Sequence, residues 1–233
     1  MSVSLLSNVG ASSANTTSIT TAAINTVGAD CIVVAVSDYP GGAGTVTVSD
    51  SQGNTWTALT PYLPSGGQQI CLYYKLLPST NASHTFSMSC TAADYPCMMV
   101  AAFSGVASYD QVAGAIGGQI QSQQPGSLTP PANGALFVTA LSLPDLSTPS
   151  VDSGFTITDY QPYTGGANMG GALAYLVQAT AGAVNPNWTW VAGINGSATQ
   201  ATFLASVAAV AVGSPLKINR GTRPRSYAPG VTR

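Results

Sequence analysis

The sequence is short of charge of both signs. Charged side chains make up 6% of the 233 residues, and the chain contains one histidine, His84, and no glutamate. Soluble proteins usually carry about 25% charged residues, so Ser, Thr, Asn, Gln and Gly must supply the surface. Such a surface gives little repulsion between copies, which favours a protein that assembles or lies against another surface.

The residues that catalysis usually needs are also scarce. A Ser/His/Asp or Cys/His centre needs a base beside its nucleophile, and His84 lies in an alternating Ser-His-Thr-Phe segment with no carboxylate nearby in the sequence. We therefore expect a strand-edge or partly buried histidine. The aspartates mostly adjoin turn-forming residues, and Asp50 and Asp152 lie in similar turns. Paired catalytic carboxylates are not indicated, and the acidic clustering that calcium usually needs is missing.

No phosphate-binding glycine motif occurs, so the sequence predicts no nucleotide site. Together with the scarcity of catalytic residues, this leads us to expect no cofactor and no enzyme. The four cysteines, Cys31, Cys71, Cys90 and Cys97, show no CxxC spacing, and with one histidine a zinc site is not expected. Buried free thiols are the first interpretation, and a bridge between Cys90 and Cys97 is the alternative.

The sequence as given also lacks membrane and export features. Its start has no basic segment followed by an apolar run of a secretory signal, and no stretch of about 18 apolar residues could span a bilayer. We expect a soluble chain without an export signal.

What is present is the pattern of β-structure. Short runs rich in Val, Thr, Ile and Tyr recur between Gly, Pro, Asn and Asp clusters, and no dozen residues show helical periodicity. The predicted strands are 3–8, 18–24, 31–37, 44–49, 55–59, 69–77, 84–90, 97–104, 118–122, 135–143, 156–160, 171–178, 187–192 and 199–212. Continuous apolar runs such as residues 31–36 predict strands covered on both faces.

The two sets of strands resemble each other at an offset near one hundred residues. Residues 31–37 correspond to 135–142, residues 70–74 to 171–175, residues 83–86 to 186–190, and residues 98–103 to 204–210. This weak repeat predicts an internal pseudo-twofold. We expect a β-sandwich over residues 1–212 with halves of about 1–115 and 116–212, forming one sandwich or two abutting ones. Residues 119–131 are the expected crossover.

The positive charge collects at the end of the chain. Residues 1–216 hold eight Asp and one Lys, a balance of −7, whereas residues 217–233 hold five basic groups and no acid, a balance of +5. Prolines and low apolar content predict an extended arm over residues 213–233. The predicted partner-binding residues are Lys217, Arg220, Arg223, Arg225, Tyr227 and Arg233. Their charge is too sparse for a nucleic-acid site, so docking on an acidic neighbour is expected, with a solvated tail as the alternative.

Aromatic side chains give the other possible binding surface. Trp188 and Trp190 are two residues apart in a predicted strand and face the same side, as a core ridge or as a platform for sugars. The core is the favoured interpretation. Trp56, Tyr62, Tyr160 and Tyr163 are further aromatics of this kind.

The segments DSQGNTWTAL (50–59), LYYKLL (72–77), HTFSM, AAFSGV (101–106), NGALFV (133–138) and SGFT occur in the order of a known domain. Over roughly residues 28–212 the chain resembles a jelly-roll domain of tailed-phage virion proteins and bacterial surface proteins. The resemblance implies an all-β, jelly-roll-like antiparallel β-sandwich, but no catalytic residues.

For function, the resemblance implies a non-enzymatic phage virion component, a capsid decoration, cement or spike protein made in the host cytoplasm. Its expected partners are the major capsid protein and further copies of itself, with no nucleic acid and no membrane. The alternative is a carbohydrate-binding or adhesion module at a cell surface, where a glycan would be the ligand.

Overall fold

The computed structural model describes residues 2–14, 16–39, 45–63, 68–164 and 169–207, and none of these residues is helical. The fourteen strands within these ranges are β1 (Ser4–Ser12), β2 (Thr16–Thr20), β3 (Cys31–Asp38), β4 (Val46–Asp50), β5 (Thr57–Ala58), β6 (Gln69–Leu76), β7 (Phe86–Asp94), β8 (Cys97–Ser104), β9 (Val106–Gln123), β10 (Ala135–Leu143), β11 (Ser150–Val151), β12 (Thr156–Gln161), β13 (Gly170–Gln178) and β14 (Trp188–Ala205).

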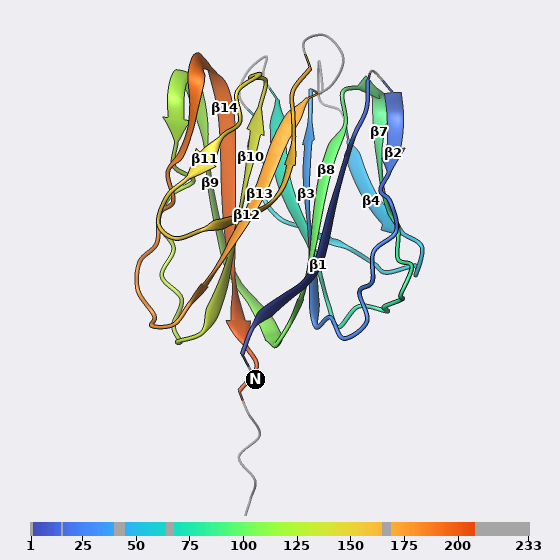
Figure 1. The fold of residues 1–233 in the computed structure, drawn as a ribbon, viewed down its shortest axis with the longest axis vertical. Coiled ribbons are helices and arrows are strands. Elements are labelled where there is room, and N and C mark those ends of the chain that lie inside the picture. Colours follow the sequence, from blue (N-terminus) through green and yellow to red (C-terminus); the bar gives the residue numbers. More distant parts are fainter. Residues whose placement is uncertain (1, 15, 40–44, 64–67, 165–168, 208–233) are drawn as a thin grey trace, which may run out of the picture.

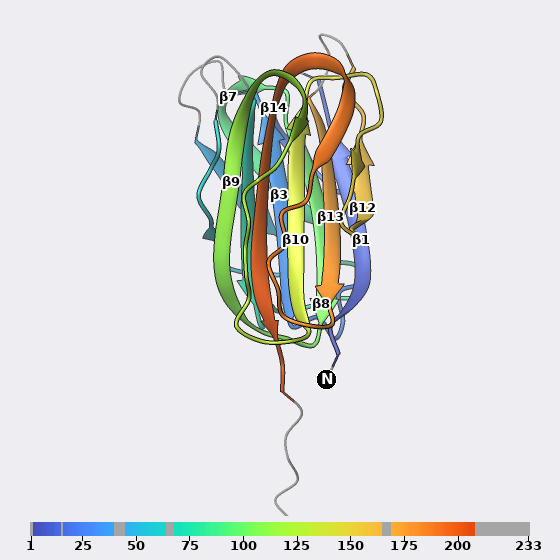
Figure 2. The same cartoon turned by 90° about the vertical axis from the view of Figure 1, so that its left-hand side faces the viewer.

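The strands form three antiparallel sheets. One has the order β1-β8-β3-β6-β5, a second has the order β11-β14-β10-β13-β12 with β9 on β14, and a small third has the order β2-β7-β4. The long strands β9 and β14 bend together over one end of the molecule, so that each passes from an inner layer to an outer one (Figure 2). The molecule is therefore an antiparallel β-sandwich.

The strands lie in successive layers (Figure 1), and clusters of apolar side chains pack between them. The central cluster lies between the two large sheets and includes Val33 and Phe103 from one and Val138 and Phe203 from the other. A second cluster lies under the three-stranded sheet, and a third lies on the far side of β10 and β13. Strands β3 and β10 are buried along their whole length, as their continuous apolar runs predict.

Most predicted strands match the structure, and strands β8 and β10 match to the residue. The largest miss is β9, of which only residues 118–122 were predicted, because its Ala and Gly residues have low strand propensity. The predicted crossover at residues 119–131 consequently begins inside β9. The two strands predicted at 187–192 and 199–212 are one bent strand, β14, which ends at Ala205.

The two large sheets share a pairing order, because β1-β8-β3-β6-β5 runs in the same sequence as β9-β14-β10-β13-β12. Phe103 lies opposite Cys31 in one half, as Phe203 lies opposite Leu136 in the other. This register differs from the expected match of residues 98–103 with 204–210. It aligns Phe103 with Phe203 instead.

Contacts between the halves are reciprocal. The rings of Phe103 and Tyr175 have centroids 5.5 Å apart, and those of Phe203 and Tyr74 are also 5.5 Å apart. Tyr74 lies opposite Val33 on β3, as Tyr175 lies opposite Val138 on β10. Such reciprocity is characteristic of isologous interfaces, in which residue i contacts j and j contacts i.

Ser4 pairs with Ser104, and Ala205 pairs with Val106, at one end of the sandwich. The described chain therefore begins and ends at the same end of the sandwich, the lower end in Figure 1.

Candidate functional site

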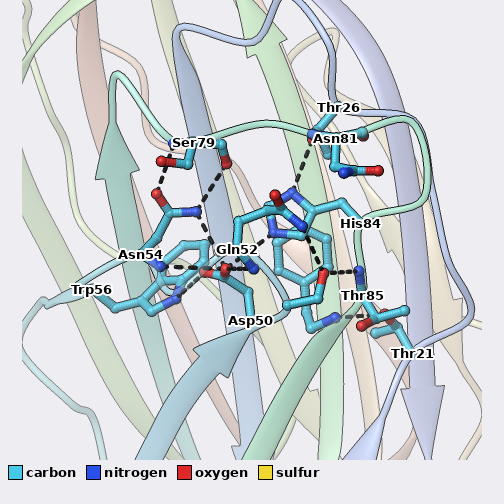
Figure 3. A network of polar contacts seen from close by, with 12 residues as sticks. Thr21, Thr26, Asp50, Gln52, Asn54, Trp56, Ser79, Asn81, His84 and Thr85 are labelled. Carbon is cyan, nitrogen blue, oxygen red and sulfur yellow. Dashed lines mark hydrogen bonds and ion pairs between the residues drawn. The ribbon is translucent and has the colours of Figure 1, made fainter.

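The polar and ionisable side chains best suited to a chemical role lie around Asp50, at the end of β4. The Asp50 carboxylate accepts hydrogen bonds from the backbone N–H of Gln52 (2.7 Å) and of Asn54 (3.3 Å), from the Asn54 side chain (3.3 Å) and from the Trp56 indole (2.9 Å). Gly53, at φ +69°, permits the tight turn that points these donors inward. The segment from Asp50 to Trp56 is thus one turn built around one carboxylate (Figure 3).

His84 enters this network from a separate part of the chain. Its Nε2 lies 3.2 Å from Oδ1 of Asp50, an ion-pair separation without the direction of a good hydrogen bond, and both side chains are fully buried. Its Nδ1 lies 2.9 Å from Oγ1 of Thr26, and its ring stacks on Phe86 with centroids 4.3 Å apart. No carboxylate lies near His84 in the sequence, but Asp50 lies beside it in the folded chain. The pairing of β4 with β7 brings these two residues together although they are 34 positions apart.

The order Thr26, His84, Asp50 is that of a nucleophile, a base and an orienting acid. However, His84 and Thr26 are 0% exposed, and Thr26 Oγ1 also bonds the backbone of Asn81. A substrate cannot reach a hydroxyl enclosed in this way without local unfolding. The arrangement therefore acts as a polar clamp that joins three loops at one end of the outer sheet.

The second half holds no such pair at the corresponding place. Leu128 bridges to Val184 as Ile24 bridges to His84, and Val151 pairs with Trp188 as Asp50 pairs with Phe86. Val184 and Val151 both belong to the outer apolar cluster of that half. The same architecture therefore forms with apolar residues where the first half has His84 and Asp50.

Asp152 follows Val151 and serves its own turn, accepting hydrogen bonds from the Asn187 backbone (2.7 Å) and from Ser153 Oγ (2.8 Å). Because Val151 corresponds to Asp50, Asp152 corresponds to Ser51 in the first half. The expected match of Asp152 with Asp50 is therefore wrong by one position. Within the described ranges, no three His, Cys, Asp or Glu side chains are placed to hold a metal ion.

The part of the surface that the structure describes carries almost no exposed charge. Among the Asp, Lys and His side chains whose exposure the structure describes, only Asp152 is exposed, and the others are buried or half-buried. Burial raises the pKa of Asp145, but hydrogen bonds from Ser147, Ala192 and Leu146 outweigh burial and lower the pKa below its usual value. The charges that the structure describes are therefore few, and all of them except Asp152 are at least partly removed from solvent.

All four cysteines are buried free thiols, which confirms the first interpretation and excludes the Cys90–Cys97 bridge. Burial raises the pKa of the Cys71 thiol to about 12, and burial also raises the pKa of Cys31 and Cys97. Nucleophilic thiolates are therefore suppressed.

The aromatic platform is absent from the surface. Trp188 is 0% and Trp190 is 6% exposed, which confirms that both belong to the core. Trp56, Tyr62, Tyr160 and Tyr163 are partly buried and pack against the apolar clusters. The predicted partner-binding residues, Lys217, Arg220, Arg223, Arg225, Tyr227 and Arg233, lie outside the described residues.

The described ranges hold no helix long and apolar enough to cross a bilayer. Comparison of the chain with protein-family models, curated proteins and solved structures gives no match.

Proposed function

We propose that this protein is a non-enzymatic structural component of a phage virion, a decoration or cement subunit that lies on the capsid surface and is held there by its basic C-terminal arm. In this role the sandwich supplies a rigid, inert body and residues 213–233 supply the attachment. Its partners are the major capsid protein and further copies of the same chain.

The observation that carries the proposal is the inert character of the body. The one histidine is enclosed with its carboxylate, the thiols are buried, and Asp152 alone among the Asp, Lys and His side chains of described exposure is exposed. A body with so few exposed charges packs beside its copies with little repulsion. The +5 arm then supplies attraction toward an acidic neighbour.

The place where the described chain ends fits attachment at one end of the sandwich. The described chain ends at Val207, just after β14 pairs with the start of β9 at the end where the N-terminal strand also begins. If the arm holds the capsid, the end of the sandwich at Val207 faces the capsid and the opposite end faces outward.

We also propose that the halves are structural repeats related by a pseudo-twofold through β3 and β10. Three observations support this relation: the shared strand order, the reciprocal Phe–Tyr pairs, and the hydrogen bond between Ser37 and Ser142, which stand at equivalent places on these two strands.

The adhesion alternative loses its main support, because its sugar platform of Trp188 and Trp190 is buried. The discriminating experiment compares the full chain with the chain truncated after Val212, by light scattering and by binding to purified capsids that lack the protein. Full-length binding that weakens with salt and disappears on truncation supports the proposal. Equal capsid binding by both chains, or no binding by either, contradicts it.

A further inference from the structure

The outer face of the three-stranded sheet carries hydroxyl side chains alone at its six central positions. These are Ser18 and Thr20 on β2, Ser87 and Ser89 on β7, and Thr47 and Ser49 on β4. They alternate with side chains of the second apolar cluster, such as Ile19 and Met88, which point inward. Ser87 is half-buried and the other five are exposed.

The strand register places these hydroxyls in two straight rows. Thr20, Ser87 and Ser49 form one row, and Ser18, Ser89 and Thr47 form the other. Neighbours in a row are about 4.8 Å apart, and the rows are about 7 Å apart. Hydrogen bonds join Thr20 to Ser87 (2.8 Å) and Thr47 to Ser89 (2.7 Å). The result is a two-row array of hydroxyls on one face of the sheet, in which two neighbouring pairs are joined by hydrogen bonds.

Low charge in the whole chain does not by itself produce this array. The corresponding outer face of the second half repeats one row, as Ser122, Thr189 and Ser150. The other row is not repeated, because Val191 takes the position that Ser89 has in the first half. Val191 stands two residues after Thr189, as Ser89 stands two residues after Ser87, and it is 71% exposed. The two-row array therefore belongs to the first half.

The chemistry of the face selects the class of ligand. These six positions hold no charge, which disfavours nucleic acid, acidic glycans and anionic lipid. They hold no aromatic, arginine or large apolar side chain of the kind that anchors protein interfaces. Hydroxyl groups donate and accept hydrogen bonds at once, and short side chains lose little conformational entropy when they are fixed.

We propose that the hydroxyl array on β2, β7 and β4 is a binding face for a neutral polysaccharide, recognised through hydrogen bonds between protein and sugar hydroxyls. Binding through single hydroxyl contacts is weak for one site and becomes effective when many copies stand side by side. Because no charge takes part, the affinity is independent of salt.

Frontal affinity chromatography of the full chain on immobilised dextran, mannan and amylose tests the proposal, with carboxymethyl-dextran as the charged counterpart. At least one neutral matrix is expected to retain the protein equally at about 50 mM and about 500 mM NaCl. Ser89→Lys should weaken retention about tenfold, whereas the matched Val191→Lys on the opposite outer face should not. Ser89→Thr, which keeps the hydroxyl, should be retained like the unchanged protein.

Absence of retention on all three neutral matrices overturns the proposal, as does equal loss in Ser89→Lys and Val191→Lys, or retention that salt abolishes. Self-association that Ser89→Lys removes would assign the face to a second copy and also overturn it. Thermal unfolding of each variant excludes loss of fold as the cause. The inference stands apart from capsid attachment, since the chain truncated after Val212 should still be retained.

Discussion

Individual aspartates explain how the chain keeps a low surface charge. Asp30 accepts from the Gly105 backbone N–H (2.6 Å), Asp110 from Thr202 (2.9 Å) and Asp145 from the Ser147 and Ala192 backbone (both 2.9 Å). Only the bond from Ser147 to Asp145 is local, of the kind that aspartate makes in turns. The other donors come from segments distant in the sequence, so these three acids act as hydrogen-bond acceptors that join separate parts of the fold.

The clamp around Asp50 should be far more sensitive to loss of the carboxylate than to loss of the imidazole. Asp50→Ala leaves the Gln52 N–H and the Trp56 indole without their acceptor and His84 without its ion-pair partner, and a loss of about 3–5 kcal/mol is expected. His84→Val leaves Asp50 with its hydrogen-bond donors and copies the second half, where Val184 takes the bridging position. Its cost should be about 1 kcal/mol.

Urea unfolding of both variants measures this difference. Similar losses in the two variants would show that the His84–Asp50 contact, and not the turn, holds the network together. Thr85→Val, at the half-buried position between His84 and the start of β7, serves as a control for changes at this end of the sheet.

Asp145 should make a distinct contribution to acid sensitivity. Its pKa is lowered in the folded protein, so its ionised form stabilises the fold above the pKa of the unfolded chain, and this contribution is lost as the pH falls through the lower folded value. Asp145→Asn should therefore destabilise the protein at neutral pH, and the difference from the unchanged protein should shrink below about pH 4. Denaturant titrations across this range measure it, and a constant difference would contradict the assignment.

At the scale of elements, the connection between β8 and β9 depends on one glycine. Gly105 has φ +77°, and a Cβ there would overlap the carbonyl oxygen of Ser2. Its N–H donates to Asp30, and its carbonyl accepts a hydrogen bond from the Ser206 N–H. Residues near both ends of the described chain, Ser2 and Ser206, therefore contact the connection between β8 and β9.

Gly105→Ala should consequently cost about 2–4 kcal/mol, from the left-handed backbone together with overpacking. Gly28 is the matched control, because it has φ +88° with open space around its Cβ position. Gly28→Ala should cost only about 1 kcal/mol. Equal midpoints for the two variants in urea unfolding would show that backbone conformation alone sets the cost at Gly105.

Elements with strong local patterns were predictable from the sequence, and elements set by distant pairing were not. The apolar run of β10 is bounded by turn residues and was placed to the residue. The Ala- and Gly-rich β9 becomes a strand because β14 lies beside it, a cause that no local pattern contains.

The same division applies to the candidate site. The aspartate turns and the buried Trp188 and Trp190 follow from residue type and alternation. The contact of His84 with Asp50 depends on the pairing of β4 with β7, and the hydroxyl rows depend on the register of β2, β7 and β4. Alternation alone showed which residues face outward, but not which lie side by side.

At the scale of the molecule, the halves are joined by the largest apolar cluster. Side chains of β3, β6 and β8 contact side chains of β10, β13 and β14 in the centre of the sandwich. If one half unfolded alone, the inner face of the other would be exposed to water, at a cost of about 25 cal/mol per Å² of apolar surface. The halves should therefore unfold as one cooperative unit.

The tryptophans provide a separate probe for each half, since Trp56 lies in the first and Trp188 and Trp190 lie in the second. Trp56→Phe leaves the probes of the second half, and the double change Trp188→Phe with Trp190→Phe leaves that of the first. Within each variant, the fluorescence midpoint in urea should coincide with the midpoint of the far-ultraviolet circular dichroism, which reports all the strands. If Trp56 fluorescence changes at a lower urea concentration than the circular dichroism of the same variant, the first half opens independently. The reciprocal Phe–Tyr contacts would then be too weak to couple the two halves.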